Sequence, residues 1–343
     1  MRYAIVSDVH ANLQAWRAVY DDIQAQGVDE IVSLGDIVGF GSEPARVLDS
    51  MIANVGVFVQ GNHDAAVAGL IRMNHFNKSA RHILEWTQER LHPSAISFLK
   101  DVPMVVGGEN FLCAHGDFSE PEKFRYIHQS SDAIASWDAV SERILFVGHT
   151  HIPSIHMIGE MGMPHSLPPQ ELRLNHTMRY VINVGSVGQP RDGNLDACYC
   201  LYDQEKGTIS FKRVPYDLES FIKGMHLHNL PIHPCMQEDH SASKMAEAHN
   251  MAFSPDIPDD APSKSDRRGP ASSGGRQVQT QTMKSAKSKR ARSNPVDRAM
   301  KKRPGPRRGR KPSGMSAGAF IMIIAGILFF MIAIIGIVAL AIN

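Results

Sequence analysis

Five short clusters of Asp, His and Asn residues share one feature, which is that each directly follows an apolar run. The clusters are Asp8-Val9-His10, Gly35-Asp36, Gly61-Asn62-His63-Asp64, His115-Gly116-Asp117 and Gly148-His149-Thr150-His151. Carboxylate, amide and imidazole groups are the oxygen and nitrogen donors that suit Mn, Fe, Zn or Ni. Ligands of open α/β sheets bind at the carboxyl ends of the strands, so the clusters are expected to meet at one rim. The sequence therefore predicts a centre of divalent metal ions.

The spacing within two clusters supports this prediction. Asp8 and His10 are two positions apart, as are His149 and His151, and side chains at i and i+2 of an extended segment point the same way. Any single cluster also has an ordinary explanation, since Gly-Asp is a common turn and Gly-Asn-His-Asp can cap a helix. The recurrence after five strands favours the metal centre. The four cysteines include no C-x-x-C pair, which argues against a disulfide framework and a thiolate site.

The N-terminal part alternates between strand-like and helix-like segments. Residues 2–7 form an apolar run that ends at polar residues, which is typical of a buried strand and too short for a signal peptide. The pattern continues as helix, strand, helix and strand over residues 12–26, 30–34, 44–53 and 56–59. Strands that alternate with helices at this spacing are expected to lie parallel in an α/β sheet.

After a helical region at residues 78–100, the chain changes to strands without helices between them. Gly107-Gly108 separates two apolar runs and predicts a hairpin. The strands, and a last amphipathic helix, are expected at residues 102–106, 110–114, 144–147, 154–158, 180–182, 197–202, 208–214 and 217–228. This mixed pattern predicts a second sheet packed on the first, in a domain that extends over residues 1–234.

Charge and hydropathy divide the remainder of the chain. The net charge is +1, but residues 264–311 contain 17 Lys and Arg against two Asp, a local charge of +15 that leaves −14 elsewhere. Residues 235–315 are rich in Ser, Pro, Gly, Lys and Arg, which predicts a disordered basic linker. Residues 319–342 carry no charge, and a helix of that length, at roughly 1.5 Å per residue, would cross a hydrocarbon core of roughly 30 Å. We therefore predict a transmembrane helix at residues 319–342.

The position of the basic residues before this helix predicts the orientation. We therefore expect a membrane protein with a single C-terminal span, and the positive-inside rule predicts that its catalytic domain is cytoplasmic. A cleaved GPI signal also ends in an apolar tail, but no secretory signal is expected from residues 2–7. The basic run at residues 301–311 is expected to attract anionic lipid, by about 1 kcal/mol per charge near the surface. Nucleic acid is the less favoured partner of this run.

The five motifs resemble those of the calcineurin-like metallophosphoesterase family, and they follow the same order: D-x-H, GD, GNHD, HG and GHTH. The resemblance covers residues 1–234, and residues 183–191 are similar to the N-P-G-S-V-G-Q-P-R segment of its compact bacterial and archaeal, phosphodiesterase-like branch. It implies an α/β fold of two mixed β-sheets sandwiched by helices, to which this chain adds the predicted linker and membrane helix. It also implies a metal-dependent hydrolase of phosphoric esters.

The family pattern implies the ligands of two divalent ions. One ion is expected on Asp8, His10, Asp36 and His151, and the other on Asp36, Asn62, His115 and His149, with Asp36 as the bridge. Two ions roughly 3.5–4 Å apart can clamp the attacking and leaving oxygens of an in-line displacement at phosphorus. A hydroxide shared by the two ions would be the nucleophile, so no serine or cysteine nucleophile is required.

Three further residues are candidates for catalysis. His63 is expected to be the general acid that protonates the leaving alkoxide, with a structural hydrogen bond as the alternative. Asp64 either orients His63 or caps the following helix. Arg191 either binds phosphate oxygens in bidentate fashion or forms a surface ion pair. Most histidines outside the motifs, a group that includes His156 and His233, are expected at the surface.

The sequence departs from the Ser/Thr protein phosphatases of the same family. Their G-D-x-V-D-R-G motif has an arginine where this chain has Phe40, and their R-G-N-H-E motif has one where this chain has Gln60. The motifs do not separate phosphatase from phosphodiesterase activity, and they leave the oligomeric state open. Two other functions are weighed against the hydrolase. One is a membrane-tethered inactive scaffold, which the intact ligand set argues against, and the other is a nucleic-acid-processing phosphodiesterase that uses the basic linker.

Overall fold

The computed structural model describes residues 1–236 and 281–282. All of them belong to one compact unit, Met1–Lys287. The predicted membrane helix at residues 319–342 lies outside the described residues, as does the predicted linker apart from residues 235–236 and 281–282. Within the part of the chain that the structure describes, no helix is long and apolar enough to cross a membrane.

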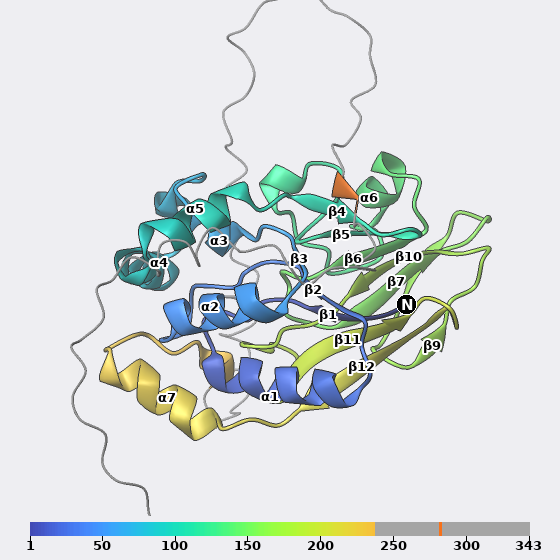
Figure 1. Cartoon of the computed structure of the whole chain (residues 1–343). Helices are drawn as coiled ribbons and strands as arrows, with labels where there is room; N and C mark the ends of the chain where they lie inside the picture. The colour runs from blue at the N-terminus through green and yellow to red at the C-terminus, as the bar shows by residue number, and fades with distance from the viewer. Residues whose placement is uncertain (237–280, 283–343) are drawn as a thin grey trace, which may run out of the picture. The chain divides into compact units, whose positions relative to one another are not determined.

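The N-terminal strands belong to a mixed sheet of six strands, here called the first sheet (Figure 1), in the order β3-β2-β1-β11-β12-β9. Its strands are β1 (Arg2–Val6), β2 (Glu30–Ser33), β3 (Val57–Phe58), β9 (Leu172–Arg173), β11 (Ala197–Asp203) and β12 (Thr208–Val214). The pairs β1–β2 and β2–β3 are parallel, which confirms the prediction from the alternating helices and strands. β11 pairs with β1 in antiparallel register, so that Tyr3 faces Tyr202.

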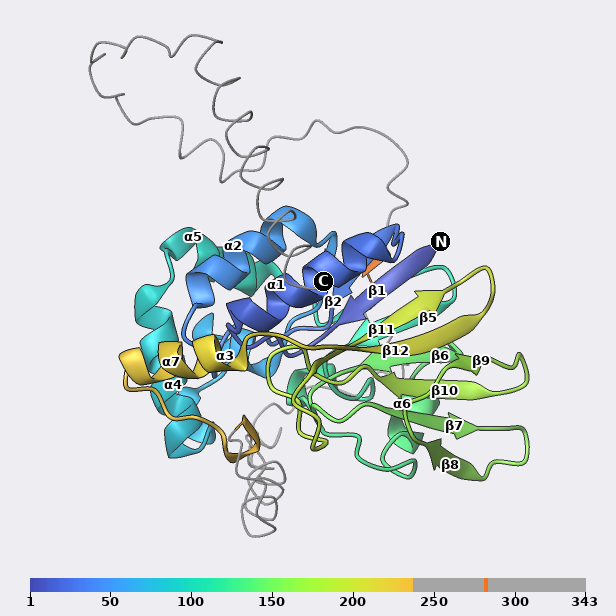
Figure 2. The same cartoon turned by 90° about the horizontal axis from the view of Figure 1, so that it is seen from below.

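The second sheet has seven strands in the order β13-β4-β5-β6-β10-β7-β8 (Figure 2). Its strands are β4 (Val105–Gly107), β5 (Phe111–Ala114), β6 (Ile144–Val147), β7 (Ser154–Ile158), β8 (Pro164–Leu167), β10 (Arg179–Asn183) and β13 (Gln281–Thr282). The hairpin predicted at Gly107-Gly108 is present as β4 and β5. β5, β6 and β10 are parallel, so their carboxyl ends lie at the same edge.

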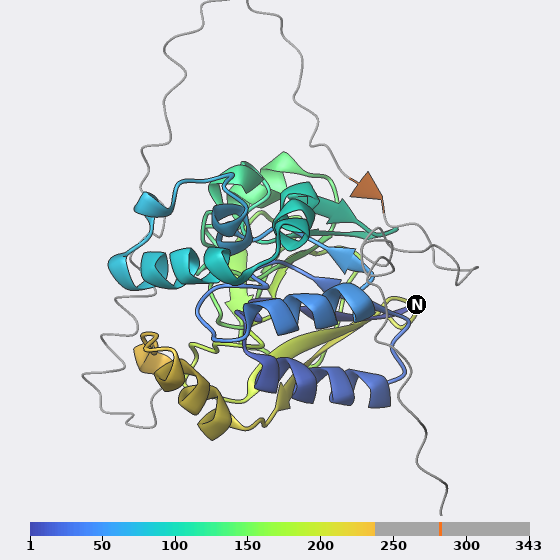
Figure 3. The same cartoon turned by 60° about the vertical axis from the view of Figure 1, so that its left-hand side comes forward.

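Helices cover the outer faces of both sheets (Figures 1 and 2). The helices are α1 (Leu13–Ala25), α2 (Pro44–Asn54), α3 (Asn62–Val67), α4 (Lys78–Arg90), α5 (Pro93–Asp101), α6 (Ile134–Ala139) and α7 (Leu218–Leu227). α1 and α2 pack on the first sheet, and α6 packs on the second. α4 and α7 lie at the same end of this unit (Figure 3), where Ile83 and Trp86 contact a cluster that includes Phe221.

The period of two along each strand divides the core into layers. In β1, Tyr3 and Ile5 pack between the two sheets, whereas Ala4 and Val6 face α1. In β5, Phe111 packs between the sheets while its neighbour Leu112 faces α6. Each of these strands is therefore buried on both faces, which fixes its register and the position of the loop that follows it.

The predicted helical region at residues 78–100 consists of two helices, α4 and α5. The break lies at Leu91 and His92, because Pro93 occupies the first turn of α5 and the residue before a proline disfavours helical backbone. His92 is extended and its ring accepts a hydrogen bond from the backbone N–H of Ser94, so it caps α5. Four short elements, β8, β9, β13 and α6, were not predicted from the sequence, and β13 falls within the predicted linker.

Candidate metal centre

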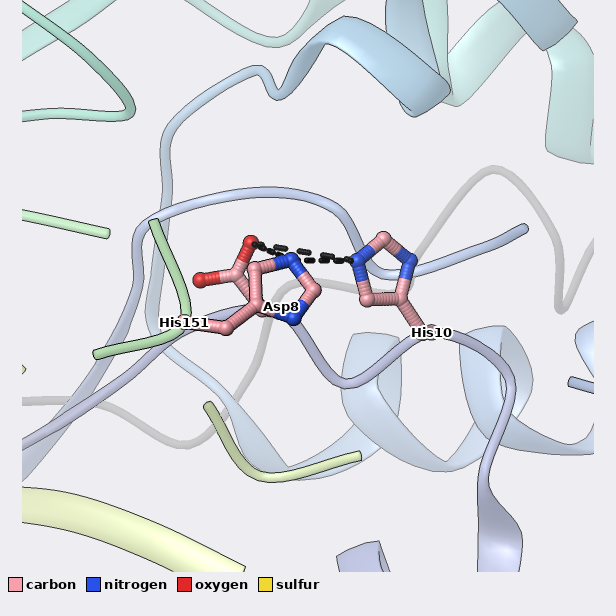
Figure 4. Close-up of side chains that lie close together, drawn as sticks. All are labelled: Asp8, His10 and His151. Atoms are coloured by element: carbon pink, nitrogen blue, oxygen red, sulfur yellow. Dashed lines mark hydrogen bonds and ion pairs between the residues drawn. The ribbon is translucent and has the colours of Figure 1, made fainter. Parts of the chain in front are cut away.

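The structure brings six of the seven predicted ligands into two buried groups. Asp8, His10 and His151 form one group (Figure 4), and Asp36, His115 and His149 form the other. Within each group the candidate ligand atoms lie within 4.8 Å of one another. The seventh residue, Asn62, begins α3 and places its side-chain oxygen 3.2 Å from Nε2 of His115. The loops after strands of both sheets thus meet, as the clusters predicted.

The carboxylate of Asp36 lies between the two groups. Its Oδ2 atom is 3.3 Å from Nε2 of His115 and 3.6 Å from Nε2 of His10. Oδ1 of Asp8 is 3.3 Å from Nε2 of His151 and 3.9 Å from Nε2 of both other histidines. Oδ2 of Asp36 therefore lies close to histidine nitrogens of both groups, and this carboxylate would be the one to hold two cations.

Backbone carbonyl groups set the tautomers of three histidines. Nδ1 of His10 is 3.1 Å from the oxygen of Val38, Nδ1 of His115 is 2.8 Å from that of Leu34, and Nδ1 of His151 is 2.7 Å from that of Gln189. A carbonyl oxygen only accepts, so each Nδ1 donates and each neutral ring keeps a lone pair on Nε2.

Lone pairs consequently face one another inside a buried cluster. Nε2 of His10 and Nε2 of His151 are 3.1 Å apart, and neither neutral ring has a proton to place between them. Oδ1 of Asp8 is buried and accepts no hydrogen bond from any described residue. Burial, above all, holds the pKa values of His10, His149 and His151 well below the usual value for histidine, so these rings are neutral. Cations would satisfy this donor set, and the residues therefore fit two metal ions.

His115 differs from the other three histidines. Burial lowers its pKa, but the neighbouring carboxylate of Asp36 outweighs burial and raises the pKa to about 9. Burial likewise raises the pKa of Asp36, while the positive charge of His115 and the interaction with His63 lower it below its usual value. The two groups form a buried ion pair without a metal, and a bound ion would take the place of the proton on His115.

The backbone at the site adopts the left-handed region, which non-glycine residues rarely occupy. Five of the candidate ligands have positive φ angles: 54° at Asp8, 49° at His10, 52° at Asp36, 68° at His149 and 60° at His151. Such a conformation costs a side chain about 1–2 kcal/mol, and it persists where surrounding structure enforces it. Its concentration at one cluster is typical of a functional site.

Comparison with known proteins identifies the family to which this chain belongs. The model of the calcineurin-like phosphoesterase superfamily domain matches residues 1–207. The chain belongs to this superfamily. The protein MJ0912 of Methanocaldococcus jannaschii, named as uncharacterized, is 32 % identical over 234 residues, which cover 66 % of this chain and 93 % of that protein.

Solved structures share the fold. A metallophosphoesterase from Sphaerobacter thermophilus has 32 % sequence identity and a TM-score of 0.59, over 73 % of this chain and 99 % of that one. The hypothetical protein PH1004 from Pyrococcus horikoshii has 19 % identity and a TM-score of 0.54, over 67 % and 94 % of the two chains. At that identity, the second likeness concerns the fold alone.

Within this phosphoesterase fold, His63 lies against the metal centre in an aromatic pocket. Its ring is 4.5 Å from that of Phe40, 4.8 Å from that of His10 and 5.2 Å from that of Phe76. Its backbone N–H donates to Oδ1 of Asp36 at 2.9 Å, and its Nδ1 has no hydrogen-bond partner among described residues. Burial holds the pKa of His63 well below its usual value although the carboxylate of Asp36 raises it. The ring is therefore neutral and carries one N–H.

Asp64 joins two loops of the site. Its Oδ1 accepts from the backbone N–H groups of Ile37 (3.0 Å) and Val38 (3.2 Å), and its Oδ2 accepts from that of Gly61 (3.3 Å). Burial, followed by the charge of Asp36, raises the pKa of Asp64 to about 7. Of the two roles considered from the sequence, the contacts favour a cap that ties the start of α3 to the loop after β2. No hydrogen bond joins Asp64 to the ring of His63 among the described residues.

Arg191 lies at the edge of the centre. Its Nη2 donates to the side chain of Gln189 at 2.9 Å, while its Nε is buried without a hydrogen-bond partner among the described residues. In that part of the chain, no carboxylate lies within 4 Å of its guanidinium. The contacts therefore give no support to the surface ion pair considered from the sequence.

Three residues at the site were not singled out from the sequence. The ring of Tyr126 stacks on that of His149, with centroids 3.9 Å apart and planes at 8°. Phe40 contacts the rings of both His10 and His63. His233, expected at the surface, is partly buried with its ring 6.4 Å from that of Phe40. None of the three follows a strand in a polar cluster, so motif spacing carries no signal for them.

Proposed function

We propose that this protein is a metal-dependent hydrolase of phosphoric esters that holds two divalent cations. The observation that carries the proposal is the position of Oδ2 of Asp36, within 3.6 Å of an unprotonated histidine nitrogen from one group and 3.3 Å from His115 of the other. One ion would be held by Asp8, His10, Asp36 and His151, and the other by Asp36, Asn62, His115 and His149. The site supports Mn, Fe, Zn or Ni by its donor types.

The ions would supply a Lewis acid and a nucleophile derived from water, as two-metal sites do in phosphoryl chemistry. The protein side chains then have separate tasks. The ring of His63, neutral in the structure without substrate, would first take up a proton, which the charge of Asp36 favours, and would then give that proton to the oxygen of the leaving alcohol. Phe40 and Phe76 hold this ring in place from two sides. The guanidinium of Arg191, which has no carboxylate partner among the described residues, can receive phosphate oxygens.

Two substitutions in the full-length protein test this proposal. Asp36→Asn removes the negative charge between the two groups, and it is expected to lose both bound metal and activity. His63→Ala is expected to keep the metal and to lose about 10²- to 10⁴-fold in kcat, the usual contribution of a general acid. The loss should be larger for an alkyl phosphate than for 4-nitrophenyl phosphate, because an alkoxide needs the proton more. Metal is measured by elemental analysis.

Exposed residues of the same types provide matched controls. Asp21→Asn in α1 and His82→Ala in α4 alter exposed side chains outside the cluster, and both should leave metal content and rate unchanged. Hydrolysis of both a monoester and a diester of 4-nitrophenol determines which class the pocket accepts. Full activity in Asp36→Asn and His63→Ala, with metal retained, would refute the proposed mechanism.

We also propose that residues 319–342 anchor the enzyme to a membrane, with the catalytic domain in the cytoplasm and the basic linker against anionic lipid. The support is the uncharged 24-residue run and the basic segment before it. A chain that ends at residue 315 should leave the membrane fraction, whereas the full chain should require detergent for its release. Release of the full chain by high salt alone would rule out the anchor.

A further inference from the structure

The segment after α7 returns to the metal centre and is held there by apolar anchors. Leu230 and Met236 are buried in one cluster with Ile83 and Trp86 of α4. Between these anchors lies His233, whose ring is 6.4 Å from that of Phe40. This packing therefore places His233, which follows α7, beside Phe40 in the loop that follows β2.

Phe40 connects His233 to the catalytic groups. Its ring is 4.8 Å from that of His10 and 4.5 Å from that of His63, and Cζ of Arg191 lies 5.8 Å from its centroid. Phe40 has a φ of +54°, which is a strained backbone for an aromatic residue. The loop accepts this strain and places the aromatic ring where His233, Arg191 and the metal centre meet.

The hydrogen bonds of His233 determine where its proton lies. Nδ1 of His233 is 2.8 Å from Sγ of Cys235 and accepts from the backbone N–H of Cys235 at 3.3 Å. Burial raises the pKa of the Cys235 thiol to about 12, so the thiol keeps its proton and can donate it to Nδ1, which therefore carries no proton in the neutral ring. Burial, followed by the positive charge of Arg191, holds the pKa of His233 well below its usual value. The ring is therefore neutral, with an N–H at Nε2. Among described residues, none accepts a hydrogen bond from this N–H.

The charges around His233 favour an anion. Arg191 has no carboxylate within 4 Å among the described residues, and its buried Nε has no partner there. Two donors without acceptors thus lie at the same edge of the site, one cationic and one neutral. The unpaired Nε of Arg191 is costly to bury, and an anionic oxygen would satisfy it and could also accept from Nε2–H of His233.

We propose that His233 and Arg191 form a phosphate subsite beside the metal centre, in which Nε2–H of His233 donates to a phosphate oxygen of the substrate. This inference rests on the proposed hydrolase function and adds a specificity-determining residue to it. Here the guanidinium comes from the loop after β10 and the second donor from the segment after α7.

The test compares two substitutions in the full-length, metal-loaded protein. His233→Leu removes the donor, and His233→Gln places an amide N–H near the position of Nε2. We expect His233→Leu to raise the inhibition constant of inorganic phosphate and to lower kcat/KM for 4-nitrophenyl phosphate, each by about 10-fold or more, as the loss of a hydrogen bond to a charged oxygen predicts. His233→Gln should stay within about 3-fold of the wild type, since it keeps the hydrogen bond.

A binding readout separates the subsite from a structural role. Inorganic phosphate should raise the Tm of the wild type and of His233→Gln, and it should raise that of His233→Leu much less. His226→Leu, which alters an exposed histidine of α7, serves as the control and should behave as the wild type. Unchanged phosphate binding in His233→Leu would overturn the inference, as would an equal loss in both variants. A wild type without phosphoesterase activity would instead refute the proposed function.

Discussion

His156 makes the stability of this protein depend on pH in a way that one substitution can isolate. It lies in β7, is 1 % exposed, and its ring is 3.0 Å from the hydroxyl of Ser154 and 2.8 Å from that of Ser166. Burial, which is the largest influence, lowers its pKa to about 4. We predict that His156→Gln, whose amide can bond to both hydroxyls, removes this pH dependence.

The size of the pH effect on the free energy of unfolding follows from the lowered pKa of His156. In the unfolded chain the pKa of a histidine is about 6.5, so between pH 6.5 and 4 the unfolded state binds more protons than the folded state. The free energy of unfolding therefore decreases as the pH falls through this window and keeps its full value above it. One pKa unit is worth about 1.4 kcal/mol, so the difference caused by His156 between pH 7 and pH 5 is about 2 kcal/mol.

Urea denaturation at pH 7 and at pH 5 measures this difference. The wild type should lose about 2 kcal/mol more than His156→Gln between the two pH values. Titration of the metal ligands affects both proteins equally, and any constant effect of the glutamine cancels in the comparison. His165→Gln, which replaces an exposed histidine on the neighbouring β8, should behave as the wild type. Equal losses in the wild type and in His156→Gln would show that burial does not disfavour the charged ring.

Two further predictions concern the support of the catalytic groups. Gly39 has a φ of +86°, and an added Cβ would lie 2.4 Å from Nδ1 of His63; Gly39→Ala should therefore displace His63 and lower kcat about 10-fold or more while the metal stays bound. Gly27→Ala is the control, because Gly27 also has a positive φ but has no atom within 4 Å of the added carbon, and an unaltered rate in Gly39→Ala would contradict the prediction. Tyr126→Leu removes the ring stacked on His149 and should weaken metal binding by about 2- to 10-fold in equilibrium dialysis, whereas Tyr126→Phe should not; equal affinities in all three proteins would exclude this role.

The sequence alone predicted elements and site residues where an apolar run is followed directly by the residues that end it. The runs before Asp8, Asp36 and His115 are buried strands. Asp8 and Asp36 lie close together because the parallel strands β1 and β2 end at one edge of the first sheet, whereas His115 reaches Asp36 from the second sheet. The hairpin at Gly107-Gly108 needed only two apolar runs and a flexible turn. In each case a short window of residues contains both the element and its end.

The sequence did not predict the elements and buried side chains that depend on contacts with residues far along the chain. β9 has two residues, and it is a strand only because β12 pairs with it. His156 looks like any polar residue of a strand, yet β8 covers it. His233 is brought to the metal centre by the burial of Leu230 and Met236 against α4. No motif marks such positions, because the partner that determines them lies far along the chain.

The candidate metal ligands and His233 also differ in the parts of the fold that support them. The candidate ligands lie on loops with strained, left-handed backbone, and the parallel strands β1 and β2 that precede Asp8 and Asp36 support these loops. That support is what allows lone pairs to face one another at about 3 Å without a proton between them. His233 lies instead in a short segment whose position depends on a few apolar anchors. The candidate metal ligands are thus held by the two sheets, while the phosphate contact proposed for His233 lies on a segment that can change without disturbing those ligands.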